Sequence, residues 1–396
     1  MKKRKLKKSF LIFILFVLTL FSLLVIGYFK NLNGDKPNIK LPIKDIIEPE
    51  EKIKTYNLSL AATGDALLHM DVIRDGKQPD GTYDFKHQLT HIKEKLKDYD
   101  LAYYNQETPF AGDDIPYSGY PRFNSPSAYG DAMIDAGFNM VSLATNHTID
   151  KGESGVLNFY NYWKKKEGIM YHGIADSEES RNQYIIQEKN NITYSMLSYT
   201  TSTNGLPIPQ GKDYLVNVYD KEKVKKDVEY LRDKVDVLIV AMHWGVEYTH
   251  TPTQEELEIA NYLAELDVDI VLGAHPHCIQ PIDIIDDTVV YYSLGNFISN
   301  QGDIVNSKGL KVIIGMLGTL NITKTVDGDN TTIEINNVGA DLLYTYDQSN
   351  KNYQVIPFSM MNDNTYLKNY ESVYEEYKSI STKLNENILI APLGSN

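Results

Sequence analysis

Residues 268–277 read VDIVLGAHPH. The apolar run up to Gly273 is typical of a buried strand, and it ends in two histidines that flank Pro276. Core packing does not require two imidazoles at this spacing, whereas a metal ion does if other ligands reach the same place. The motif therefore predicts a buried strand whose exit binds a metal, provided that other strands deliver ligands beside it.

The rest of the chain alternates between strand-like and helix-like patterns. Strand-like runs cover 57–65, 100–107, 139–147 and 235–245, and helical spacing covers 85–98, 127–138, 152–166 and 253–266. This alternation predicts an α/β fold with a largely buried sheet. After residue 283 the strand-like runs follow one another without an intervening helix, so we expect that part to be antiparallel.

Polar clusters end five of the strand-like runs: TGD, NQE, TNH, MHWG and GAHPH. Open α/β sheets build their sites in the loops beyond the carboxyl ends of the strands, so these clusters are expected at one edge. Carboxylate, imidazole and amide donors without a thiolate suit Zn, Mn, Fe and similar divalent ions. The residues of ligand type at these ends are Asp65, His69, Glu107, Asn146, His147, His243, His275 and His277.

Several of these residues, taken alone, also have a purely structural explanation. Asp65 could cap a helix, Glu107 could be a solvated loop residue, and His243 could be a hydrogen-bonded core histidine. Their expected position at one sheet edge is what favours a metal. His87 and His91 are spaced four apart among lysines in a helical stretch, and we expect both at the surface.

The amino terminus has the pattern of a membrane anchor. Six of the first eight residues are Lys or Arg, and no charge occurs from Phe10 to Phe29. A helix of this length covers a hydrocarbon core of about 30 Å. We expect a basic cytoplasmic head at 1–8, a transmembrane helix at 9–29 and an extracellular linker at 30–54, in a single-pass protein of the cell membrane. The alternative is a cleaved signal peptide, which has a shorter apolar core and a small-residue cleavage site.

The charge of the chain restricts its partners. Without the six leading basic residues, 33 basic face 53 acidic residues, a net charge of −20. Nucleic acid is therefore excluded as a partner, and an anionic substrate must be held at a local positive site. The only cysteine, Cys278, is expected to be buried and structural, and an extracellular domain with one cysteine has no internal disulfide.

Seven ordered motifs between residues 57 and 300 resemble the CapA family of capsule-synthesis proteins of poly-γ-glutamate type: TGDALLH, NQETP, YPRFNSP, ATNHTIDKG, HWGVEY, GAHPHCIQPI and YYSLGNFISNQ. That family is similar to calcineurin-like metallophosphoesterases. The resemblance implies an αββα sandwich with two central mixed sheets at 55–345, a partly helical extension at 346–396, and two divalent metal ions.

The resemblance also implies roles for particular residues. Asp65, Asn146, His243, His275 and His277 fall on metal-ligand positions, and Glu107 takes the place of a bridging aspartate. His147 matches a histidine that protonates the leaving group or stabilises the transition state. Two departures leave the metal (Mn, Zn or Fe) and the second ion open. Leu67 stands where phosphoesterases have a histidine, with His69 nearby, and the bridging acid is Glu rather than Asp.

Further residues are candidates for supporting roles. Asp150 and Glu247 are close in sequence to His147 and His243, and are expected to orient those two rings. The YPRFNSP motif suits a pocket wall in which Arg122 holds a carboxylate by two hydrogen bonds. The alternative for this motif is a loop fixed by its prolines. The pocket-wall residues would be Tyr120, Arg122, Phe123 and Asn124.

Two functions are compatible with these patterns. The first is an anchored metallohydrolase that cuts a phosphoester, or an amide of a glutamyl polymer, outside the membrane. The second is a non-catalytic protein that binds poly-γ-glutamate or another anionic envelope polymer, or assembles with the membrane-bound capsule synthase. A structural envelope protein without a site would leave the five polar strand ends unexplained.

Overall fold

Two mixed β-sheets form the centre of the computed structural model, which describes residues 53–301 and 307–395. These described residues belong to one compact unit. No helix among them is long and apolar enough to cross a membrane. The predicted head at 1–8, the predicted anchor at 9–29 and nearly all of the predicted linker lie outside the described residues.

The first sheet has nine strands. Its main order is β14-β13-β12-β1-β2-β3-β4, with β11 paired to β1 and β15 paired to β13. Strands β1 to β4 are parallel, whereas β12, β13 and β14 are antiparallel to their neighbours in the main order. The strands are β1 (Lys54–Leu67), β2 (Leu101–Asn105), β3 (Met140–Ser142), β4 (Met170–His172), β11 (Asn296–Ser299), β12 (Ile314–Asp327), β13 (Asn330–Tyr346), β14 (Gln354–Pro357) and β15 (Leu389–Ile390).

The second sheet has six strands in the order β5-β6-β7-β8-β10-β9. Its four central strands are parallel, and the two edge strands are antiparallel to their neighbours. The strands are β5 (Ile186–Lys189), β6 (Ile192–Thr200), β7 (Val237–His243), β8 (Ile270–Ala274), β9 (Ile282–Ile285) and β10 (Thr288–Tyr291).

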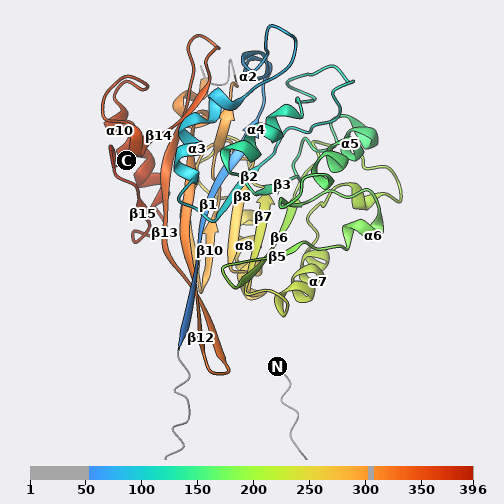
Figure 1. Cartoon of the computed structure of the whole chain (residues 1–396), viewed down its shortest axis with the longest axis vertical. Helices are drawn as coiled ribbons and strands as arrows, with labels where there is room; N and C mark the ends of the chain where they lie inside the picture. The colour runs from blue at the N-terminus through green and yellow to red at the C-terminus, as the bar shows by residue number, and fades with distance from the viewer. Residues whose placement is uncertain (1–52, 302–306, 396) are drawn as a thin grey trace, which may run out of the picture. The chain divides into compact units, whose positions relative to one another are not determined.

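Alternation of side chains along the strands builds four layers. Leu60 and Tyr103 of the first sheet pack with Ile239 of the second in one buried cluster between the sheets. The opposite face of the first sheet packs against helices that include α4 (Ala128–Ala136) and α5 (Gly152–Lys164). The opposite face of the second packs against α7 (Lys221–Arg232) and α8 (Gln254–Glu265). In Figure 1 the strands fill the middle of the view and α5 and α7 lie at its side. The predicted α/β fold with two mixed sheets is confirmed.

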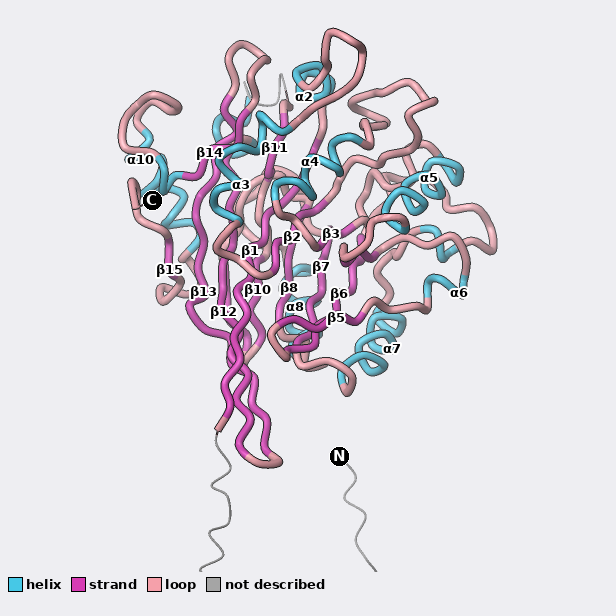
Figure 2. Tube along the Cα trace, in the orientation of Figure 1, coloured by secondary structure: helices cyan, strands magenta, loops and turns pink. Residues whose placement is uncertain are grey.

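Of the remaining helices, all except α10 are short. Figure 2 shows them as cyan segments around the magenta strands. The α-helices are α2 (Met70–Asp75), α3 (Thr90–Leu96), α6 (Glu178–Arg181) and α10 (Tyr370–Ser381), and the 3₁₀ turns are η1 (Lys86–Leu89), η2 (Asp213–Leu215), η3 (Gly309–Val312) and η4 (Phe358–Met360).

The prediction of an antiparallel region after residue 283 is only partly right. β10 pairs in parallel with β8, and β11 pairs in parallel with β1, so the chain passes from the second sheet to the first between them. The crossing brings backbone against backbone at Gly64. A Cβ atom there would lie 1.8 Å from the carbonyl oxygen of Gly295, so only glycine permits the approach. Strand order along the sequence does not reveal such a change of sheet.

The carboxyl-terminal residues are part of the same unit. β14 and β15 both pair with β13, and the tyrosines of α10 are buried in the cluster between the sheets. We predict that Tyr374→Ala lowers the free energy of unfolding by about 3 kcal/mol, because it leaves a cavity in a packed core. Urea unfolding of the full chain measures the change. Leu384→Ala, at a residue that is 46% exposed, is the control and should change it by less than about 0.5 kcal/mol.

Candidate metal centre

Five parallel strands deliver polar side chains to one edge of the two sheets. Asp65 lies near the end of β1, and Glu107 and Asn146 follow β2 and β3. His243 ends β7, and the two histidines of GAHPH follow β8. The edges of the two sheets are in contact at this point. His243 Nε2 lies 3.0 Å from Asn146 Oδ1, and His277 Nδ1 lies 3.5 Å from Asp65 Oδ2. The structure therefore brings together the residues that the sequence placed at separate strand ends.

The side chains form two overlapping groups that share one carboxylate. Glu107, His243 and His275 make the first group, and Asp65, Glu107 and His277 make the second. Within each group the ligand-type atoms all lie within 4.8 Å of one another. A carboxylate common to two such groups is the arrangement by which a dinuclear centre shares a bridging ligand.

Glu107 fits a metal better than it fits any other role. Both of its carboxylate oxygens are buried and have no hydrogen-bond partner among the described residues, and the same holds for Nδ1 of His275. Burial raises the pKa of Glu107 well above its usual range. A buried carboxylate without a partner is costly, and a divalent cation at this point would supply the missing interaction. The donor set of carboxylates and imidazoles suits such an ion.

The pKa values of the three ligand-type histidines are shifted in different directions. Burial lowers the pKa of His243 well below its ordinary value and lowers that of His275 to about 4. Burial alone would also lower the pKa of His277, but the carboxylates of Glu107 and Asp65 raise it to about 9. The centre therefore attracts positive charge on the side of His277, as a cation site should.

Two asparagines that the sequence reasoning missed support Asp65 and its neighbours. In the first sheet Asp65 is the register partner of Asn105 on one side and of Asn296 on the other. Asn105 Nδ2 donates to Asp65 Oδ1 at 2.7 Å, and His277 Nδ1 lies 3.0 Å from Asn296 Oδ1. Both residues stand in motifs already noted, NQE and YYSLGNFISNQ, but their role depends on strand pairing.

The backbone of GAHPH is held in an unusual conformation. His275 has φ +98° and His277 has φ +57°, values that non-glycine residues seldom adopt. The turn is fixed from outside, since the backbone N–H of His275 donates to Asp65 and that of Tyr248 donates to the carbonyl of Pro276. Strained backbone of this kind persists where the surrounding structure determines it, often at functional sites.

His147 lies beside the two groups without belonging to either. Its Nδ1 lies 2.8 Å from Asp150 Oδ2, and the same oxygen accepts a hydrogen bond from the backbone N–H of Phe123. The Phe123 ring packs edge-on against His147, with centroids 4.7 Å apart, and also against His69. Asp150 and Phe123 thus fix the orientation of the His147 ring.

Some candidate residues occupy other places than the sequence suggested. Glu247 does not contact His243; its Oε1 lies 4.0 Å from His277 Nε2, because the chain turns after β7 and passes the exit of β8. Asn124 does not line a pocket, because its amide bonds the backbone of residues 111, 112 and 115. Tyr120 and Arg122 are exposed.

His69 belongs to neither of the two groups found among the described residues. Its Nδ1 accepts a hydrogen bond from the backbone N–H of Asn300. Burial, with His277 next in importance, lowers the pKa of His69 to about 3. His69 is therefore a neutral ring at the border of the centre.

The other histidines and the cysteine lie apart from both groups. His87 Nε2 pairs with Asp75, His91 Nε2 lies 3.2 Å from Gln354 Oε1, and Cys278 is buried. Burial raises the pKa of the Cys278 thiol to about 12, so it is not a thiolate.

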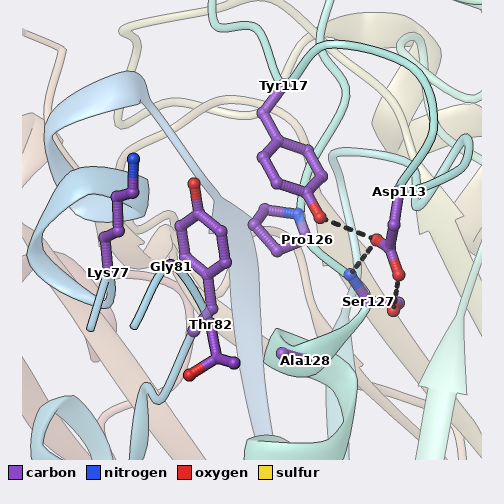
Figure 3. A pocket seen from close by; sticks show the side chains of 9 residues that line it. Lys77, Gly81, Thr82, Asp113, Tyr117, Pro126, Ser127 and Ala128 are labelled. Atoms are coloured by element: carbon purple, nitrogen blue, oxygen red, sulfur yellow. Dashed lines mark hydrogen bonds between the residues drawn. The ribbon is translucent and has the colours of Figure 1, made fainter. Parts of the chain in front are cut away.

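A surface pocket of about 540 Å³ is lined in part by residues of the segment 113–128, which contains Phe123. None of the candidate ligands lines this pocket. Figure 3 shows Tyr117 donating to Asp113, which also accepts hydrogen bonds from Ser127. These bonds join the two ends of the segment 113–127. The pocket is therefore distinct from the candidate metal centre.

The fold and the centre define an α/β sandwich with a candidate divalent-metal site at one edge of its sheets. The family model described as "Bacterial capsule synthesis protein PGA_cap" matches residues 59–301, and the chain belongs to this family.

Two curated relatives have similar sequences. Capsule biosynthesis protein CapA of Bacillus anthracis is 25% identical over 271 residues, 65% of this chain and 64% of the relative. PGA biosynthesis protein CapA of Bacillus subtilis is 22% identical over 257 residues, 63% of this chain and 66% of the relative. The matched part thus spans less than two thirds of the length of either relative.

Solved structures with a similar arrangement include two phosphoesterases. The calcineurin-like phosphoesterase YfkN from Bacillus subtilis has a TM-score of 0.42 and 15% identity, over 71% of this chain and 91% of that chain. The 5'-nucleotidase precursor from Thermus thermophilus has a TM-score of 0.42 and 16% identity, over 71% of this chain and 54% of that chain.

Proposed function

We propose that this protein is a metal-dependent hydrolase that acts in the synthesis or export of poly-γ-glutamate or another anionic cell-surface polymer. The observation that carries the hydrolase proposal is Glu107, which belongs to both ligand groups and whose two buried oxygens have no hydrogen-bond partner among the described residues. The capsule role is supported by family membership and by the printed functions of the two CapA relatives.

The residues that would hold two divalent ions, Mn, Zn or Fe, are Asp65, Glu107, Asn146, His243, His275 and His277. Such ions, when bound, lower the pKa of a water molecule and neutralise charge that builds on oxygen. His147 supplies the proton or hydrogen bond for the leaving group, because its Nδ1 faces Asp150 and its Nε2 has no hydrogen-bond partner among the described residues. Burial of the surrounding side chains excludes bulk water and strengthens each of these interactions.

Arg122 is the candidate contact for an acidic group of the substrate. Its guanidinium forms no hydrogen bond or ion pair with any described residue, although the protein carries an excess of acidic side chains. Its neighbour Phe123 packs on His147, so Arg122 is attached to the border of the centre. A guanidinium can bind a carboxylate through two parallel hydrogen bonds.

A second function, binding without catalysis, is favoured by the names of the relatives, which state biosynthesis and not hydrolysis. In this case the metal centre would hold an anionic polymer or help to assemble the membrane-bound synthase. The same residues serve both functions, and turnover separates them.

The test uses the full chain, purified without a chelating tag. The hydrolase proposal expects bound divalent metal and, with added Mn, turnover of an aryl phosphate or of poly-γ-glutamate. Metal without turnover of any phosphoester or glutamyl polymer would favour the binding function, and absence of metal would contradict both.

We also propose that residues 9–29 anchor the protein in the cell membrane with the carboxyl-terminal domain outside. The uncharged run behind six basic residues supports this placement. Sequencing of the mature amino terminus tests it, and a chain beginning near residue 30 would contradict it.

A further inference from the structure

Glu247 lies at the border of the candidate metal centre, with 41% of its side chain exposed. The backbone N–H of Trp244 donates to the carbonyl of Ala274 at 3.1 Å, and that of Tyr248 donates to the carbonyl of Pro276 at 2.8 Å. These two bonds hold the chain on both sides of Glu247 against the turn that carries two of the candidate histidines. The position of Glu247 is therefore set by the backbone around it.

One ring nitrogen of His277 is committed to a hydrogen bond within the protein. Asn296 Nδ2 lies 2.8 Å from the carbonyl oxygen of Val312 and 3.1 Å from Gln301 Oε1. Because a carbonyl oxygen can only accept, the amide nitrogen of Asn296 must be the atom that faces it. Asn296 Oδ1 is then the atom that lies 3.0 Å from His277 Nδ1, so this ring nitrogen donates. Nε2 is left as the ring nitrogen of His277 that can bind a metal ion.

Two carboxylates converge on His277 Nε2. Glu107 Oε1 lies 3.8 Å from this nitrogen, and Glu247 Oε1 lies 4.0 Å from it. Two donor atoms that each bind one ion at about 2.1 Å are about 3.0 Å apart at right angles and at most about 4.2 Å apart. Both observed spacings therefore fit donors that share an ion with His277.

The charges at this point favour a cation. Burial raises the pKa of Glu107 well above its usual range, and the carboxylates of Asp65 and Glu247 raise it further, against the opposite effect of His277. No lysine or arginine of the described residues lies within 4.0 Å of the Glu247 carboxylate. A divalent cation between Glu107 and Glu247 would replace the repulsion of the two carboxylates by attraction to a shared positive charge.

We propose that Glu247 is a further protein ligand of the ion that Asp65, Glu107 and His277 would hold. This inference rests on the proposed function and adds to it a ligand from a loop. The ligand-type atoms that all lie within 4.8 Å of one another do not include an atom of Glu247. Its exposed side chain can turn toward the ion, because no lysine or arginine of the described residues holds its carboxylate. Three carboxylates and one imidazole suit Mn²⁺, which is therefore the probe.

The test compares Mn²⁺ binding by wild type, Glu247→Gln and Glu255→Gln on the full chain, by equilibrium dialysis at increasing Mn²⁺ concentration. Glu255 is exposed in the first turn of α8, so its variant makes the same change of charge outside the centre. We expect Glu247→Gln to keep one tightly bound ion and to bind the second more than about 100-fold more weakly than wild type. A partner outside the ligand shell would cost only roughly 10–100-fold. Glu255→Gln should bind two ions as wild type does.

Thermal unfolding without metal checks the fold, and we expect the same Tm for wild type and Glu247→Gln because the side chain is exposed. Two tightly bound ions in Glu247→Gln would overturn the ligand role, and a loss of about 100-fold or less would make Glu247 an outer partner of His277 instead. If wild type binds a single ion, its loss from Glu247→Gln supports the ligand role and contradicts only the second ion of the proposed function, whereas its retention overturns the ligand role. Wild type without any metal would contradict the proposed function itself.

Discussion

On the proposed two-metal centre, we expect Glu107→Gln to abolish binding of both metal ions to the full chain, whereas His275→Ala should remove tight binding in only one of the two groups. The amide keeps the shape of the side chain but cannot serve as the shared negative ligand of both groups. Loss of a direct ligand should exceed the roughly 10–100-fold loss of affinity expected for a partner outside the ligand shell. Metal content after dialysis against a weak chelator gives the stoichiometry of each variant.

Stability measurements distinguish a lost ligand from a damaged fold. Bound metal stabilises the native state according to its concentration and dissociation constant, so the wild type should gain thermal stability with added Mn and Glu107→Gln should not. Without metal, Glu107→Gln should be at least as stable as wild type, because it removes a buried group that has no partner among the described residues.

Two variants provide matched controls for this prediction. Glu256 is also buried, but it caps α8 by accepting a hydrogen bond from Thr253, so Glu256→Gln should keep both ions. His87 forms an exposed pair with Asp75, and His87→Ala should keep both ions as well. If either control lost metal as fully as Glu107→Gln, the assignment of the ligand groups would be wrong.

The positions of the candidate ligands could be predicted from the sequence because neighbouring parallel strands end at the same edge of a sheet. A residue that ends a buried parallel strand must lie at the same edge as the end of its neighbour, so Asp65 could be placed with Glu107 in one sheet, and His243 with His275 in the other, without coordinates. The residues that pair with Asp65 on the neighbouring strands could not be predicted from the sequence. Asn105 and Asn296 support the centre only because strand register sets them on either side of Asp65.

Sequence proximity was a poor guide where the chain turns sharply. Glu247 is four residues from His243, yet it lies beside His277, because Trp244 already bonds to the end of β8. Asp150 is three residues from His147 and does contact it, because the backbone there stays within one tight turn. The segment β6 was not predicted at all, since its buried serines and threonine interrupt the apolar pattern, although the hydroxyls of Ser195 and Thr200 are hydrogen-bonded.

His147→Ala will keep the metal ions and the affinity for an anionic ligand, but it will lower the turnover rate by roughly 10²–10⁴-fold. His147 lies outside both ligand groups, so its removal leaves every direct ligand in place. Its ring is fixed by Asp150 and Phe123, so that Nε2 is the ring atom available to the leaving group. Metal content, ligand affinity and hydrolysis rate are measured on one preparation.

Asp150→Asn refines this prediction, because an amide can still lie beside His147 Nδ1 but is a weaker hydrogen-bond acceptor than a carboxylate. Its turnover should fall between wild type and His147→Ala, with unchanged metal content. In a binding protein no charge develops at this position, so both variants would behave as wild type. Unchanged hydrolysis by His147→Ala with intact metal would remove His147 from the mechanism and leave the metal centre alone as the source of catalysis.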